Sequence, residues 1–198
     1  MFLMFLTLFI QMPPANAEDV CPLLIGQPLP TLELNDSNGN PFDVNKAVGE
    51  GTTVLIFYRG SWCPFCNRHL GQLQEVLPKL EAFGAQLFAI SPDRPDIVET
   101  PAEKQDLGYR LLSDSSMQAA KAMGIAFKLD DATVTKYKSS YKIDIEADSG
   151  QTHHLLPVPA VFVIDRNGTI QFSYVNPNYK ERLEPEILLA VVKSLSGD

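Results

Sequence analysis

The segment TTVLIFY at residues 52–58 constrains the fold more than any other part of the chain. It is a continuous run of apolar and β-branched residues without polar alternation, which is typical of a strand buried on both faces of a sheet. Residues 64–83 follow after a short gap, and their apolar residues recur at the three- and four-residue spacing of one helix face: Leu70, Leu73, Leu77 and Leu80. This strand and this helix are the first unit of a predicted α/β fold.

Apolar and turn patterns indicate the remaining elements. We expect hairpins over 31–44 and 159–175, with Asn38-Gly39 and Asn167-Gly168 in their turns. We also expect a buried strand over 85–91, helix or loop over 92–109, and helices over 116–125, 131–141 and 184–195. Together they predict a mixed central sheet that is flanked by helices on both faces, with an N-terminal β-hairpin extension.

Charge and repeat patterns limit the class of protein. The chain has 198 residues and a net charge of -8, without any run rich in Lys or Arg. A chain of this kind is repelled by phosphates, so nucleic acid is excluded as a partner. No internal repeat or long linker interrupts the sequence, which predicts one domain over 18–198.

The first 17 residues have the outline of a secretory signal peptide. An apolar run extends from Phe2 to Ile10, and Ala15-Asn16-Ala17 forms an A-x-A cleavage site before Glu18. The run is shorter than the ~20 residues of a membrane-spanning helix. The segment departs from a typical signal peptide in one respect, since no Lys or Arg precedes the apolar run. We expect a periplasmic or secreted protein, and a membrane-anchored or cytoplasmic protein is the alternative.

Two cysteines occupy the junction between the predicted strand and helix. Cys63 precedes Pro64, which suits the first helical position because it lacks an N–H. The positive end of the helix favours a thiolate at Cys63, so its pKa should lie below the free value of ~8.5. Cys66 lies one turn into the helix, where it is more buried and close enough to resolve a mixed disulfide. The pattern predicts a redox dithiol that needs no cofactor.

Two other interpretations of the cysteine pair are open. The cysteines could be unreactive core residues, or they could be half of a zinc site completed by Cys21, His69 or the doublet His153-His154. None of these residues has the spacing of a zinc finger. We expect His69 to pack on its helix and the histidine doublet to lie in a solvated loop. Cys21 could be a free thiol or a late-binding partner.

Val158-Pro159 lies directly before a predicted buried strand. We expect this peptide bond to be cis and Pro159 to face the dithiol. Cis bonds occur at only about 5% of X-Pro positions in folded proteins, and the alternative is that Pro159 simply begins an edge strand.

The motifs FYRGSWCPFCN, FAISPD and PVPAVFVIDRNGTI together resemble the AhpC/TSA, or peroxiredoxin-like, branch of the thioredoxin-like superfamily. The resemblance covers residues 25–195. It implies a thioredoxin-like fold, an active site at Cys63 and Cys66, and Pro159 as the cis-proline that faces them.

The chain also departs from the peroxiredoxin pattern of this branch, which is Pro-x-x-x-Thr-x-x-Cys with a distant arginine. Aligned on that pattern, Arg59 replaces the proline, Cys63 replaces the threonine, and Cys66 falls on the peroxidatic cysteine. The distant arginine falls on Pro159. Cys63 and Pro159 are the residue types that thiol-disulfide oxidoreductases have at these positions.

We therefore expect a thiol-disulfide oxidoreductase with a redox-homeostasis role. Cys63 attacks, Cys66 resolves, and Trp62 and Pro159 shape the docking surface for a protein thiol or disulfide partner or a thioredoxin-type reductant. One alternative is a thiol-dependent peroxidase with Cys66 or Cys63 as the peroxidatic cysteine. With Cys66 in this role, Arg59 supplies the positive charge and Cys63 resolves. Another is a non-catalytic binding or scaffold domain, against which the intact C-x-x-C motif argues.

Overall fold

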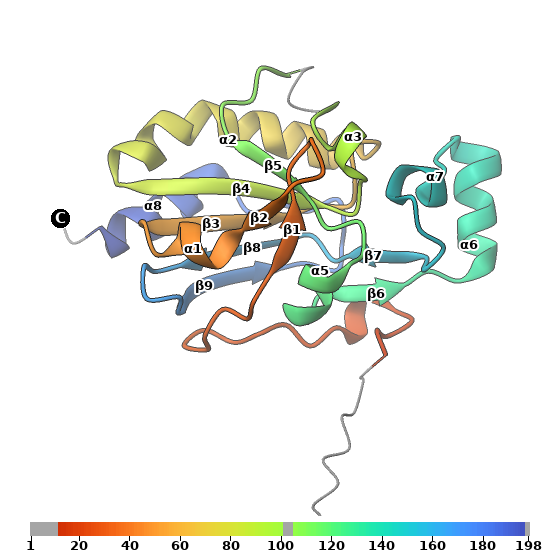
Figure 1. The fold of residues 1–198 in the computed structure, drawn as a ribbon, viewed down its shortest axis with the longest axis horizontal. Helices are drawn as coiled ribbons and strands as arrows, with labels where there is room; N and C mark the ends of the chain where they lie inside the picture. The colour runs from red at the N-terminus through yellow and green to blue at the C-terminus, as the bar shows by residue number, and fades with distance from the viewer. Residues whose placement is uncertain (1–11, 101–104, 197–198) are drawn as a thin grey trace, which may run out of the picture.

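The computed structural model describes residues 12–100 and 105–196, and its centre is a seven-stranded mixed sheet (Figure 1). The strand order is β2-β1-β5-β4-β3-β8-β9. β3, β4 and β5 are parallel, whereas the other four strands join the sheet in antiparallel pairs. The strand bounds are β1 Glu33–Asn35, β2 Pro41–Asp43, β3 Thr52–Phe57, β4 Ala85–Ser91, β5 Arg110–Ser113, β8 Ala160–Ile164 and β9 Ile170–Val175. The predicted mixed sheet and both predicted hairpins are confirmed.

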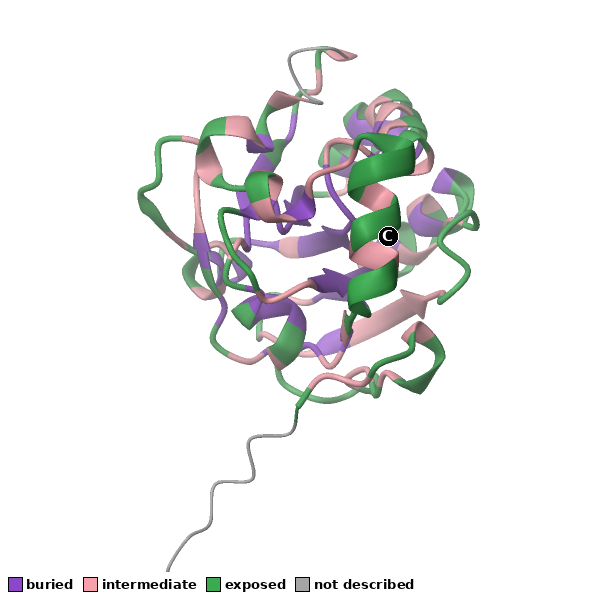
Figure 2. Ribbon diagram, turned by 90° about the vertical axis from the view of Figure 1, so that its right-hand side faces the viewer, coloured by how far each residue is buried: buried purple, intermediate pink, exposed green. Residues whose placement is uncertain are grey.

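Helices cover both faces of this sheet, as predicted. On one face, α2 (Pro64–Ala82) and α8 (Pro185–Leu195) pack over alternate residues of β3, including Val54 and Ile56. On the other face, α1 (Val44–Val48) and α5 (Gln118–Ala122) pack over the intervening residues, Leu55 and Phe57. Figure 2 shows buried strands at the centre and exposed residues on the outer sides of the helices.

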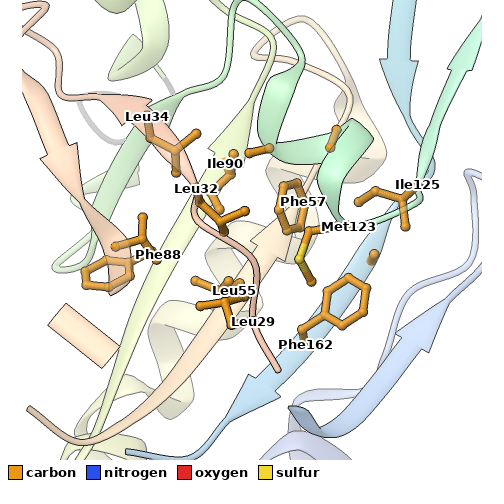
Figure 3. Packing of buried hydrophobic residues seen from close by; sticks show 14 of the residues in the cluster. Leu29, Leu32, Leu34, Leu55, Phe57, Phe88, Ile90, Met123, Ile125 and Phe162 are labelled. Carbon is orange, nitrogen blue, oxygen red and sulfur yellow. The ribbon is translucent and has the colours of Figure 1, made fainter. Parts of the chain in front are cut away.

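The core on the α1 and α5 face is built around aromatic contacts. The rings of Phe57 in β3 and Phe162 in β8 meet edge to face with 6.2 Å between their centroids, and Met123 lies beside them (Figure 3). Successive residues of β3 point to opposite faces of the sheet, and helices cover both faces. Each side chain from Val54 to Phe57 therefore meets an apolar core, which explains the uninterrupted apolar sequence.

The sequence analysis missed one strand of the central sheet and a small second sheet. β5 lies between β1 and β4, but it has four residues, of which the first, Arg110, is exposed. β6 (Ala126–Lys128) and β7 (Leu155–Pro157) pair antiparallel outside the central sheet. The segment between them contains α6 (Asp131–Lys136), the π-helical turn η2 (Tyr137–Tyr141) and α7 (Ile145–Ser149). These elements project from one side of the molecule (Figure 1).

The structure describes only residues 12–17 of the predicted signal peptide. Most of the predicted signal peptide, including Phe2 to Ile10, lies outside the described residues. The predicted cleavage site, between Ala17 and Glu18, lies within a short 3-10 helix, η1 (Ala17–Asp19). The segment 92–109, predicted as helix or loop, contains the short helix α3 (Pro95–Val98). Residues 101–104 of this segment also lie outside the described residues. None of the helices within 12–100 and 105–196 is long and apolar enough to cross a membrane.

Candidate active site

A tight turn connects the end of β3 to the start of α2. Gly60 within it has a φ of +140°, and a Cβ there would lie 2.5 Å from Nε1 of Trp62 and 3.1 Å from Oδ1 of Asp93. Only glycine fits this conformation and this close approach without strain. Oδ2 of Asp93 accepts hydrogen bonds from the Ser61 amide at 2.7 Å and from the Ser91 hydroxyl at 2.9 Å. The buried carboxyl therefore fixes the turn from the end of β4.

Cys63 is the N-cap residue of α2. Its carbonyl accepts the first helical hydrogen bond from the Asn67 amide at 3.0 Å, and Pro64 follows at the first helical position, as predicted. The Asn67 side chain donates to the Ser61 carbonyl at 2.8 Å and so braces the turn against the helix. Cys63 is only 1% exposed, so its sulfur lies beneath the surface of the site.

The pKa of the Cys63 thiol is lowered to about 6. The main cause is a hydrogen bond from the Cys66 side chain, supported by the Cys66 backbone and by the positive charges of Arg59 and Arg182, whereas burial opposes the shift. The direction agrees with the sequence analysis, but the cause differs in part. The neighbouring thiol contributes more than the helix terminus on which the expectation rested.

Cys66 has the opposite character. It is 1% exposed, and burial raises its pKa well above the ordinary value, with the hydrogen bond to Cys63 and the Cys63 charge acting in the same direction. Nη2 of Arg182 lies 3.2 Å from its sulfur and opposes this shift. Both cysteines are free thiols. The site is thus a reduced dithiol in which Cys63 ionises far more readily than Cys66. The two residues are equally little exposed, whereas the sequence analysis expected Cys66 to be the more buried.

Arg59 lies beside the dithiol in a cradle of aromatic rings. Its guanidinium carbon is 4.2 Å from the ring centroid of Tyr179, 4.9 Å from that of Trp62 and 5.8 Å from that of Tyr137. It donates a hydrogen bond to the Tyr137 hydroxyl. Arg59 is 5% exposed and forms no ion pair within residues 12–100 and 105–196. The site therefore contains a buried cation that no carboxylate of the described chain neutralises.

The segment 176–184, between β9 and α8, covers the dithiol. Tyr179 meets the ring of Phe65 at 5.8 Å, and Arg182 contacts Cys66. Nε2 of His69 lies 3.1 Å from the Leu183 carbonyl, and burial lowers the pKa of His69 to about 4. A neutral His69 donates this bond, so it fastens the segment to α2. The expectation that His69 packs on its helix is consistent with this position.

The expectation of a cis bond at Val158-Pro159 is wrong. The described residues contain no cis peptide bond, so this bond is trans. The trans form is favoured by about 0.5–1 kcal/mol at X-Pro bonds, and the chain is already extended here: the Val158 amide bonds to Ile125, and the Pro159 carbonyl accepts from Asn176. Pro159 precedes β8 and lines a cavity with Arg59 and Tyr179. Its place near the site remains, but the argument from a cis-proline is lost.

The remaining candidates for a metal site do not converge. His153 is half-buried against the Ser115 carbonyl at 2.9 Å, and His154 pairs with Glu146 at 2.8 Å. The doublet is therefore not the solvated loop that we expected. Cys21 is exposed and lies beside Gly124, away from the dithiol. Within 12–100 and 105–196, no group of three or more Cys, His, Asp or Glu residues is arranged to hold a metal ion.

Sequence reasoning missed four side chains of this site. Arg182, Tyr137 and Tyr179 reach it from segments far along the chain, and no local motif marks them. Asp93 belongs to the FAISPD motif, so its position directly after a buried strand was the one available signal. The comparison of motifs places Pro159 where peroxiredoxins have their distant arginine, whereas Arg182 brings an arginine to Cys66 from another segment.

Comparison of the chain with known protein families identifies the family to which it belongs. The profile of the AhpC/TSA family matches residues 25–173, and the chain belongs to this family. It is therefore a thiol-dependent oxidoreductase.

Two curated relatives show the range of the family. The thiol-disulfide oxidoreductase ResA of Bacillus thuringiensis subsp. konkukian is 22% identical over 161 residues, which is 81% of this chain and 75% of ResA. The chloroplastic peroxiredoxin Q of Arabidopsis thaliana is 28% identical over 163 residues, which is 82% of this chain and 64% of the relative.

Solved structures agree on the fold. The peroxidoxin BcpB of Mycobacterium tuberculosis superposes with a TM-score of 0.67 and 20% identity, covering 86% of this chain and 97% of BcpB. Reduced Prx3 of Vibrio vulnificus gives a TM-score of 0.69 and 18% identity, covering 86% of this chain and 99% of Prx3. The predicted thioredoxin-like fold is confirmed, and at these identities the similarity shows the fold alone.

Proposed function

We propose that this protein is a thiol-disulfide oxidoreductase in which Cys63 attacks and Cys66 resolves. The observation that carries the proposal is the unequal ionisation of the two thiols. At pH 7 a thiol with a pKa of about 6 is mostly thiolate, whereas the buried Cys66 is protonated. Because only the thiolate is nucleophilic, the first attack on a disulfide comes from Cys63.

The exchange proceeds in two balanced steps. The Cys63 thiolate attacks one sulfur of the substrate disulfide, that bond breaks, and the first substrate thiolate leaves with the electron pair. Cys66 then loses its proton and attacks the Cys63 sulfur, which releases the second substrate thiolate and forms the protein disulfide. The substrate gains two electrons from the protein; one proton comes from Cys66 and the other from solvent, because Cys63 reacts as a thiolate.

Arg182 supports the role of Cys66 in both directions of exchange. Its guanidinium, 3.2 Å from the Cys66 sulfur, stabilises the thiolate that forms when Cys66 is deprotonated for resolution. It does the same when a reductant attacks the protein disulfide at Cys63 and Cys66 is the leaving group. We therefore assign Arg182 a stabilising role in the second step.

Peroxide reduction at Cys66 is the second candidate, and the contact with Arg182 favours it. A positive charge beside the sulfur could polarise a peroxide. Burial argues against this candidate, however, because it keeps Cys66 protonated at neutral pH. Exposure does not distinguish the two thiols, since each cysteine is 1% exposed. Peroxide would meet a thiolate more readily at Cys63.

Trapping the intermediate tests the assigned roles. The Cys66→Ser variant, mixed with the mixed disulfide of glutathione and another thiol, should accumulate a stable adduct on Cys63 that mass spectrometry locates. Cys63→Ser is the matched control and should form little adduct, because the raised pKa of Cys66 keeps its thiol protonated. A rapid adduct on Cys66 in Cys63→Ser would reverse the roles.

The partner and the compartment follow from this chemistry as proposals. A protein disulfide or a thioredoxin-type reductant would dock beside Trp62, which is half-buried at the edge of the site. We also propose that residues 1–17 are removed on export and that 18–198 form one domain. The N-terminal residue of the protein secreted by its native host, read by mass spectrometry, should be Glu18; retention of Met1 would contradict export with cleavage.

A further inference from the structure

A cavity of about 230 Å³ is lined by Arg59, whose charge acts on Cys63, although neither cysteine of the dithiol lines the cavity itself. Its walls are mostly apolar and come from segments far apart in the chain: Phe127, Leu129, Val158, Pro159, Pro177 and Tyr179. Drug-sized ligands occupy pockets of roughly 300–1,000 Å³, so this cavity suits a ligand smaller than a typical drug, such as a short-chain acid. An apolar cavity of this size favours a short aliphatic body.

One wall of the cavity carries the buried cation. Arg59 and its hydrogen-bond partner Tyr137 both line the cavity. A guanidinium has five N–H donors, and Tyr137 is the one acceptor that Arg59 has within residues 12–100 and 105–196. The aromatic rings around it attract the cation but do not neutralise it. The negative charge that faces Arg59 within the described residues is the Cys63 thiolate, and the guanidinium N–H groups that Tyr137 does not use have no acceptor among those residues. These free donors make this wall of the cavity complementary to a further anionic group.

Glu18 does not fill this role. It is the one acidic side chain that lines the cavity within the described chain, but it is exposed and forms no ion pair with Arg59. The planar fork of a guanidinium matches a carboxylate in bidentate geometry. A carboxylate at one end of an aliphatic ligand would therefore satisfy the cation while the rest of the ligand contacts the apolar walls.

We propose that the cavity binds the carboxylate end of a short aliphatic thiol or disulfide and thereby presents its sulfur to Cys63. This inference rests on the proposed function, because it names the class of small substrate that the dithiol exchanges with. The step is the exchange already described: Cys63 attacks the anchored sulfur, the substrate disulfide breaks, and Cys66 displaces the second substrate thiolate. Two electrons pass from the protein to the substrate, with one proton from Cys66 and one from solvent.

The test compares substrates that differ only in charge. The disulfides of mercaptopropionic and mercaptohexanoic acid are mixed separately with the reduced protein, each beside its neutral diamide. Bidentate pairing with a charged partner is worth about tenfold or more in rate, so at least one acid should oxidise the dithiol about tenfold faster than its diamide. The net charge of -8 would otherwise favour the neutral compound.

Two arginine variants identify the anchor. In Arg59→Gln the ratio of acid to diamide rates should fall to about one, whereas the matched Arg182→Gln should keep the ratio even if both of its rates fall. Using the ratio removes the effect of Arg59 on the reactivity of Cys63 itself. Equal rates for acids and diamides in the wild type, or an unchanged ratio in Arg59→Gln, would overturn the inference.

A thiol-free ligand separates this inference from the proposed function. Octanoate should slow alkylation of Cys63 in the reduced wild type, because it covers the Arg59 charge, and octanamide should have less effect. If octanoate protects Cys63 but no disulfide oxidises the protein, the proposed function fails and the carboxylate site remains. If disulfides react but octanoate and octanamide act alike, the function holds and the carboxylate site is refuted.

Discussion

Replacing Cys66 should raise the pKa of Cys63, because the Cys66 thiol is the main cause of its lowered value. A hydrogen bond to a charged group is worth about 1.5–3 kcal/mol, and one pKa unit corresponds to about 1.4 kcal/mol. Cys66→Ala should therefore raise the pKa of Cys63 from about 6 by about one to two units. Its thiolate fraction at pH 7 would fall from about nine-tenths to between about a half and a tenth.

The assay is the pH dependence of alkylation by iodoacetamide in a Cys21→Ser background, where Cys63 is the one remaining cysteine once Cys66 is replaced. Cys66→Ser is the matched control, since its hydroxyl keeps a donor at the same position, and its pKa should stay closer to that of the wild type. A pKa that remains near 6 in Cys66→Ala would refute the reasoning, because the shift would then arise from the helix terminus and the arginines alone.

Three further predictions concern the frame around the dithiol. Burial raises the pKa of Asp93 to about 6, so the folded state binds its proton more tightly than the unfolded chain and loses stability as pH rises from about 4 to 6. In urea unfolding, Asp93→Asn should remove that loss, at most about 3 kcal/mol, and parallel pH profiles for the variant and the wild type would contradict it. Gly60→Ala should destabilise the fold by more than the ~1–3 kcal/mol of backbone strain, since its Cβ also clashes with Trp62. Gly168→Ala, in an open turn, should destabilise the fold only by the backbone strain. Tyr179→Ala should speed alkylation of Cys63 at saturating pH by uncovering its sulfur, and an unchanged rate would mean that Tyr179 does not limit access.

The sequence predicts the parts of the fold that local patterns encode. The strand 52–58 and the helix 64–83 were readable because their apolar spacing is set by burial against one sheet. β5 was not readable, because a four-residue strand is too short to show a period, even though it lies in the middle of the sheet.

In the candidate site, too, local features were predicted and contacts between distant segments were not. The cysteine pair and its junction with a helix are local, and the sequence predicted both. Arg182 reaches Cys66 across 116 residues of sequence, and Tyr137 reaches Arg59 across 78, so only the fold brings them together. The bond before Pro159 was predicted wrongly because a motif does not determine the isomer that the surrounding hydrogen bonds select.

The most direct test of disulfide exchange is a comparison of two oxidants on the reduced protein. Trp62 is the only tryptophan of the chain and directly precedes Cys63, so its fluorescence should report formation of the Cys63–Cys66 disulfide. The mixed disulfide of glutathione should oxidise the dithiol efficiently, whereas hydrogen peroxide should react at the rate of an ordinary thiolate. If peroxide instead reacts orders of magnitude faster, and Cys66→Ser abolishes that reaction while Cys63→Ser traps a sulfenic acid on Cys66, the protein is a peroxidase and the account is contradicted.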